Sequence, residues 1–240
     1  GSTAGGVTIS STIDGAVDLD ISSGTGAVAI QGVVGGTTAL ATLDVNATDG
    51  SGTIEVTDIG DGNPSAGVTG LTRLGNINTG TLTLDGSNYD FGGGFTLGSG
   101  TYTLSGSTGA FTSTGDVSFL GNVVVDGTFS VDSGGGDISI AGNITGTNGD
   151  EIVTLTDGTA GDGTGTITIG GYIGNTTGNT SNIKSVTLTG DTGISLGGDI
   201  TTSTAATSSV DINGNVLEFV ELCPVCNLAE GIDYHQDQCH

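Results

Sequence analysis

The residues best suited to binding a transition metal lie together at the end of this chain. All three cysteines and both histidines fall among the last 18 of its 240 residues, and Cys223, Cys226, His235 and Cys239 have the spacing Cys-x2-Cys-x8-His-x3-Cys. Two thiolates two residues apart can hold one tetrahedral ion from a tight turn, and a following His and Cys complete four ligands. This pattern predicts a structural zinc-like site. Disulfides, within the chain or to a neighbouring subunit, and incidental thiols are the open alternatives.

Acidic residues on glycine-rich turns form a second group that could bind a ligand. They occur at residues 58–63, 148–151 and 157–162, where carboxylate and amide oxygens follow each other closely. Calcium sites require such oxygen ligands, although none of the three segments has the spacing of an EF-hand loop. Asp and Gly are also the ordinary residues of solvated turns. Solvated corners are therefore the simpler interpretation, and calcium binding is the alternative.

Catalysis is disfavoured by what surrounds these groups. Arg73 and Lys184 are the two basic residues, they lie far apart in the sequence, and the first 222 residues contain no histidine or cysteine. Asp18 and Asp20 would share one face of a strand, but no third catalytic group accompanies them. We therefore expect no enzyme. A polysaccharide-acting β-helix enzyme, which would need clustered carboxylates or a basic residue beside calcium, is the alternative.

The charge balance excludes several kinds of partner. Asp and Glu number 26 against two Lys and Arg, giving a formal net charge of −24. Nucleic acids and anionic membranes need clustered Lys and Arg, so neither is an expected partner. No apolar run approaches the roughly 18 residues that a membrane-spanning helix needs. The acidic, cysteine-free body favours an exported protein in an extracellular or cell-surface location.

Short strands are the elements that must position all of these groups. Apolar residues alternate with polar ones, which is the pattern of a strand with one buried face. Glycine, Asn, Asp and Ser stand between the strands and permit tight turns. The alternation is clearest at residues 7–9, 17–21, 54–56, 82–84, 102–104, 152–155 and 186–188. The body is therefore predicted to be all-β.

A recurring unit, apolar-x-apolar-x-Gly-x-apolar, predicts how these strands are arranged. It occurs at residues 28–34, 117–123, 138–144, 167–173, 194–200 and 210–216, and its last five copies follow at intervals of 16 to 29 residues. Such intervals are typical of the coils of a solenoid. About nine coils stacked at roughly 4.8 Å would make a rod roughly 45 Å long. An antiparallel sandwich is the competing fold, disfavoured because aromatic residues make up 4% of the chain and Trp is absent.

Residues 28–45, 116–144 and 167–200 resemble the degenerate strand repeats of large bacterial surface proteins, of the filamentous-haemagglutinin-like or autotransporter-passenger type. The resemblance covers about residues 5–216 and is compositional. It implies a right-handed parallel β-helix, often a stalk segment of a longer exported adhesin. It transfers no catalytic residue to this chain.

These observations predict a repeat body at residues 1–216 and a tail at 217–240, in which residues 217–222 could cap one end of the rod. The predicted function is a structural or adhesive rod: a spacer, a fibre subunit or a surface stalk. Its partners would be further copies, joined end to end, or a glycan or surface ligand. Residues 1–13 could lend a strand to the next copy. Pairs of Thr at residues 81/83, 101/103, 166/168 and 187/189 could instead form one flat ladder, as in ice-binding solenoids.

Overall fold

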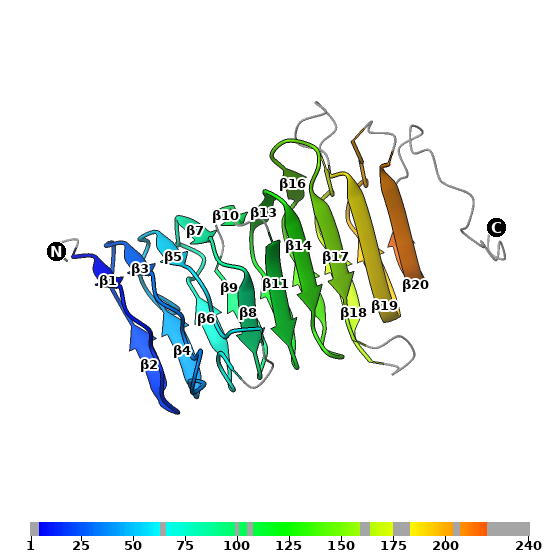
Figure 1. Ribbon diagram of the computed structural model, residues 1–240. Helices are drawn as coiled ribbons and strands as arrows, with labels where there is room; N and C mark the ends of the chain where they lie inside the picture. The colour runs from blue at the N-terminus through cyan, green and yellow to red at the C-terminus, as the bar shows by residue number, and fades with distance from the viewer. Residues whose placement is uncertain are drawn as a thin grey trace, which may run out of the picture.

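The computed structural model describes residues 5–62, 66–98, 101–104, 108–158, 164–174, 183–203 and 207–219. Within these residues every regular element is a β-strand and every strand pairing is parallel. Parallel pairing throughout is incompatible with the antiparallel sandwich. The predicted all-β solenoid is confirmed (Figure 1).

The strands stack in three columns, which we call A, B and C. Column A contains β1 (Val7–Ile9), β3 (Val28–Ile30), β5 (Ile54–Val56), β7 (Thr81–Leu84), β10 (Thr101–Leu104), β13 (Asn122–Val125) and β16 (Ile144–Gly146). Column B contains β2 (Asp18–Ile21), β4 (Thr42–Val45), β6 (Thr72–Leu74), β9 (Phe95–Leu97), β12 (Val117–Phe119), β15 (Ile138–Ile140), β18 (Thr166–Ile169) and the last part of β19 (Ser185–Leu196). Column C contains β8 (Asn88–Phe91), β11 (Thr108–Ser113), β14 (Thr128–Asp132), β17 (Ile152–Thr156), the first part of β19 and β20 (Ser209–Phe219).

One turn of the solenoid visits the columns in the order A, C, B, as in β10, β11 and β12. Along column A the stacked residues are Val7, Val28, Ile54, Leu82, Tyr102, Val123, Ile144, Ile173 and Ile200, which bound eight turns. Eight turns span roughly 40 Å at a strand spacing near 4.8 Å. There are fewer turns than the nine expected because some are long: Leu82 and Tyr102 are 20 residues apart, but Ile144 and Ile173 are 29 apart. The right-handed sense remains a prediction.

The core is one continuous cluster of apolar side chains from all three columns, and it runs through the turns. The inward residue of nearly every strand is Val, Ile, Leu or an aromatic residue with almost no exposure. Aromatic rings gather in the middle turns, where the Phe119 ring centroid lies 5.4 to 5.8 Å from those of four neighbours. These neighbours are Phe95, Tyr102, Phe111 and Phe129. The aromatic residues, although few, are thus concentrated where they contact one another.

The recurring glycine unit marks the corner between columns B and A. Four of its six copies, at residues 117–123, 138–144, 167–173 and 194–200, lie there. A Cβ on Gly171 would lie 2.1 Å from the Asn143 side-chain oxygen, so only glycine fits. That Asn143 oxygen accepts the Tyr172 N–H (3.0 Å), and the Asn122 oxygen accepts the Asn143 N–H (2.9 Å). Asparagine thus links these corners from turn to turn.

The first turn is less completely buried than those that follow. Val7, Ile9, Ile13 and Leu19 point toward the core but are only partly buried. β1 pairs with β3 of its own chain along one edge, and the lending of a strand by residues 1–13 to another copy stays a prediction. At the other end β20 continues to Phe219, past the expected boundary at residue 216. Of the suggested cap at residues 217–222, positions 220–222 lie outside the described residues.

One buried hydroxyl in column B is unsatisfied. Thr72 points inward between Leu43 and Phe95 with no exposure, and its Oγ1 is the one buried side-chain polar atom of the described residues without a hydrogen-bond partner. Replacing Thr72 with valine removes that hydroxyl while keeping the shape, so it should raise the free energy of unfolding by about 1 kcal/mol. Urea denaturation would measure the gain. Thr42→Val is the control: the Thr42 hydroxyl donates to Asp18 (2.7 Å), so no gain is expected there.

Candidate functional site

The predicted zinc ligands Cys223, Cys226, His235 and Cys239 all lie outside the described residues, so the zinc-like site remains a prediction. Within the described residues no three His, Cys, Asp or Glu side chains gather closely enough to hold a metal ion. This applies to the described parts of the acidic turns considered for calcium. Calcium binding at these turns stays a prediction, and carboxylates there accept hydrogen bonds from the backbone of the protein.

Carboxylates at the corners accept hydrogen bonds from the backbone of the next turn. Asp14 accepts the N–H groups of Thr37 (2.7 Å) and Thr38 (3.1 Å), and these bonds lower its pKa. Asp58 accepts the N–H groups of Ser87 (2.8 Å) and Asn88 (3.0 Å). Charged acceptors satisfy backbone donors that a tight corner leaves without partners. Part of the acidity of the chain therefore serves to join turns.

Glu151, in one of the segments considered for calcium, caps a turn. Its side chain is fully buried and accepts the N–H groups of Thr147 (2.6 Å), Asn148 (2.7 Å) and Gly149 (2.9 Å), and the Thr147 hydroxyl (2.9 Å). Burial alone would raise the pKa of Glu151. The hydrogen bonds from Asn148, Glu151 and Thr147 outweigh it and hold the pKa below the ordinary 4.5.

Glu151→Gln should lower the free energy of unfolding at pH 7 by about 1 to 3 kcal/mol, because glutamine offers one acceptor where the carboxylate offers two. Since the folded-state pKa is depressed, the contribution of Glu151 is complete well above pH 4.5 and is lost as pH falls through that value toward the folded pKa. Urea denaturation from pH 7 down to pH 3 would show the difference between native protein and variant shrinking. A difference that stayed constant with pH would contradict this account. Asp150→Asn, at an exposed neighbour, is the control.

Asp90 is a buried carboxylate with the opposite tendency. It is 3% exposed, and its Oδ2 accepts the Gly62 N–H (2.9 Å). Burial raises its pKa, and the nearby Asp61 charge adds to this, against the lowering effect of backbone hydrogen bonds. Asp90 thus makes folding less favourable as pH rises through its titration, whereas Glu151 makes it more favourable.

The outward face of column B carries the groups considered for catalysis. Asp18 and Asp20 do share one face of β2, and Asp20, Asp44 and Arg73 occupy one register row. Arg73 donates to both oxygens of Asp44. The Arg73 side chain is 42% exposed, so the pair contributes little to stability. The guanidinium is engaged by the Asp44 carboxylate, and the described residues of this row contain no third acidic group.

The threonine pairs do not form one ladder. Thr81 and Thr83 of β7 are in register with Thr101 and Thr103 of β10 in column A. The pair at residues 166 and 168 lies in column B, and the pair at 187 and 189 lies in column C. The alternative of one flat threonine face is therefore wrong, because the four pairs, which recur at irregular intervals, are divided among three columns.

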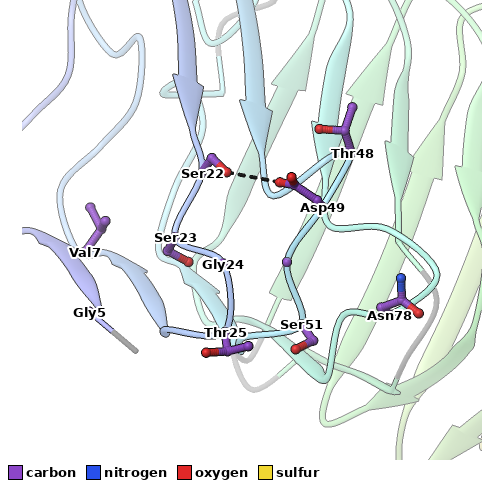
Figure 2. A pocket seen from close by; sticks show the side chains of 11 residues that line it. Gly5, Val7, Ser22, Ser23, Gly24, Thr25, Thr48, Asp49, Ser51 and Asn78 are labelled. Carbon is purple, nitrogen blue, oxygen red and sulfur yellow. Dashed lines mark hydrogen bonds between the residues drawn. The ribbon is translucent and has the colours of Figure 1, made fainter. Parts of the chain in front are cut away.

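A polar groove of about 860 Å³ lies where the first three corners between columns B and A stack. The residues after β2 and β4 form most of it, with Asn78 from the next corner and Val7 from β1 (Figure 2). Asp49 is its single carboxylate and accepts a hydrogen bond from the Ser22 hydroxyl (3.2 Å). The groove is shallow and open to solvent, and its lining combines hydroxyls and glycine backbone with a comparable amount of apolar surface.

Two asparagines hold the wall of this groove. The Asn46 side-chain oxygen accepts the Ser23 N–H (2.8 Å), and its amide nitrogen donates to the Ser23 hydroxyl (3.0 Å). The Asn76 amide donates to the carbonyls of Asn46 (2.6 Å) and Gly50 (3.0 Å). Asn46 is 2% exposed and has φ of 46°, a conformation that Asn tolerates better than most residues. Three consecutive corners are thus fixed against one another.

Sequence reasoning did not identify this groove. Its signal is a cluster of small polar residues and glycine directly after a strand, Ser, Thr and Gly at residues 22–26 and Asn, Thr, Asp and Gly at 46–50. The described residues include no helix of the length and apolarity that crossing a membrane requires. No family model, curated protein or solved structure matches the chain. Function must therefore be inferred from the geometry alone.

Proposed function

We propose that this protein is an extracellular, non-catalytic rod that acts as a stalk or as a fibre subunit. The observation that carries the proposal is the core of apolar side chains, only partly buried in the first turn, that runs through eight parallel turns. In a core of this kind each turn is stabilised by its contacts with the turns on either side, and this makes the stack stiff. The acidic surface keeps rods soluble and limits random association.

An open strand edge in the first turn supports end-to-end assembly. The Val7 N–H donates to Ala27 and the Ile9 carbonyl accepts from Gln31, so both face β3. Thr8 lies between them and, because alternate residues of a strand point their polar groups to opposite sides, its N–H faces the open edge. Such an edge, beside partly buried Val7 and Ile9, can accept one more turn of the same geometry from a second copy.

The test is negative-stain electron microscopy combined with light scattering over a range of protein concentrations. Thr8→Pro deletes the edge donor without removing a bond to β3, and Thr8→Val keeps the donor. Filaments formed by the native protein and by Thr8→Val, but not by Thr8→Pro, would identify a fibre subunit. Isolated short rods at every concentration would identify a stalk. Repeating the experiment with reductant and with chelator asks whether the Cys/His tail takes part in the joint.

Two results would overturn the proposal. One is a scattering measurement that gives the particle a maximum dimension well below the roughly 40 Å that eight stacked turns span. The other is release of reducing ends or unsaturated products from polysaccharides incubated with the purified protein, because this would establish the β-helix enzyme instead. The catalytic alternative would then have to involve Asp20, Asp44 or Arg73, and Arg73→Gln should abolish product release.

A further inference from the structure

The groove at the first three corners has the dimensions and chemistry of a binding site. Its volume of about 860 Å³ falls in the range of roughly 300 to 1,000 Å³ that is usual for small-molecule sites. Its wall is already fixed by the Asn46 and Asn76 hydrogen bonds, so a ligand would meet a preorganised surface. The side chains of these asparagines are occupied by hydrogen bonds within the wall. Several of the side chains that project from the wall are not occupied in this way.

Several of the projecting groups have no partner within the described residues. The hydroxyls of Thr25, Thr48 and Ser51 make no hydrogen bond there, although all three residues line the groove. Asp49 accepts one bond, from Ser22, and a carboxylate can accept about four. Figure 2 shows these side chains coming from two consecutive corners of the turn stack. The groove therefore offers several donors and acceptors within one concave surface.

The chemistry of the lining restricts the ligand. None of the described residues that line the groove is Lys or Arg, and Asp49 is negative, so anions are repelled. The groove has one carboxylate, whereas the calcium sites of sensor and buffer proteins combine several carboxylates with carbonyl oxygens, so the lining favours a neutral ligand over calcium. Val7 is the one apolar side chain larger than a threonine methyl in the lining, which leaves a peptide without anchors. A neutral molecule with many hydroxyls matches these groups, because each hydroxyl both donates and accepts.

We propose that this groove binds a neutral saccharide, with Asp49 accepting from sugar hydroxyls and with Thr25, Thr48 and Ser51 completing the contacts. The inference does not depend on the rod assembling, since the groove lies within one chain. It assigns the surface ligand expected of an adhesive rod to a chemical class, the neutral saccharides, and to a position, this groove. A failed assembly experiment would leave it unaffected, and its own failure would leave the rod role standing.

The test is an NMR titration of the full chain with neutral tetrasaccharides of glucose, mannose and N-acetylglucosamine, and with tetragalacturonate as the anionic comparison. A neutral sugar should produce saturable shifts at the amides of Gly24, Gly50 and Ser51, and tetragalacturonate should not. Asp49→Ala should weaken this binding by about tenfold or more, as expected when a charged hydrogen-bond acceptor is lost. Asp150→Ala, which removes an exposed carboxylate at another corner, should leave it unchanged.

The inference is overturned if none of the three neutral sugars shifts those amides at millimolar concentration. It is also overturned if Asp49→Ala binds as tightly as the native protein, or if tetragalacturonate binds there as well as the neutral sugars. Because Asp49 is exposed, its replacement is not expected to affect folding. Circular dichroism of each variant would verify this, and Asp49→Asn, which keeps an acceptor oxygen, should restore part of the affinity.

Discussion

Phe119→Ala is expected to lower the free energy of unfolding by about 3 to 5 kcal/mol, a large fraction of the stability of most domains. Phe119 has no exposure, and its ring meets the edges or faces of four other rings from three consecutive turns. Alanine would leave a cavity that these neighbours cannot fill without losing contacts among themselves. The loss should therefore exceed that of a single aliphatic truncation in the core.

Urea denaturation followed by circular dichroism would measure this loss. Ile77→Ala is the matched control, because Ile77 is 76% exposed and its truncation should change stability by no more than about 0.5 kcal/mol. Phe119→Leu should give an intermediate value, since it retains part of the volume. A loss below about 1 kcal/mol for Phe119→Ala would mean that the middle turns are not packed as described.

Gly86→Ala is expected to be comparably damaging for a steric reason. A Cβ on Gly86 would lie 1.6 Å from the Thr57 carbonyl oxygen of the preceding turn. That oxygen accepts the Tyr89 hydroxyl (2.8 Å), which in turn accepts the Gly86 N–H (2.8 Å). The obstacle is backbone rather than a flexible side chain, so the two turns must separate and this linked pair of bonds must break. We expect a loss of about 3 kcal/mol or more.

Gly80→Ala is the control for this experiment. Gly80 lies one corner earlier, and its nearest neighbour, the Ser51 carbonyl oxygen, would stand 3.6 Å from the added Cβ, an ordinary contact. Thermal unfolding of both variants should therefore show a large fall in midpoint for Gly86→Ala and almost none for Gly80→Ala. Equal effects would indicate that loss of glycine flexibility, and not the approach of Thr57, decides the outcome.

The strands were predictable from the sequence because one inward face imposes a period of two. Six of the seven segments singled out by alternation fall within strands, and the seventh, residues 17–21, extends one residue beyond β2, at the exposed Val17. The column C positions of the early turns were harder to recognise. There each turn contributes a single bridge residue, at Ile13, Val34 and Ile59, instead of a strand. A single apolar residue cannot show the alternation that identifies a strand in the sequence.

The roles of the carboxylates could not be read from the sequence. Asp58 and Glu151 each lie two residues from a glycine, yet one binds backbone in the next turn and the other caps its own turn. Asp58 and Ser87 are 29 residues apart, and the variable length of the turns hides such pairings. The groove escaped notice for the same reason, because it exists only once corners separated by that distance are stacked.

The dependence of each turn on its immediate neighbours has a mechanical consequence. Strands pair in the order of the turns, so tension applied to the two ends of the chain would peel turns from the ends one after another. Successive stacked residues are 20 to 29 positions apart, so each detached turn would add roughly 70 to 100 Å of contour length. Under load the molecule would lengthen in steps and dissipate energy at each step. It would thereby limit the peak force that is transmitted along the chain.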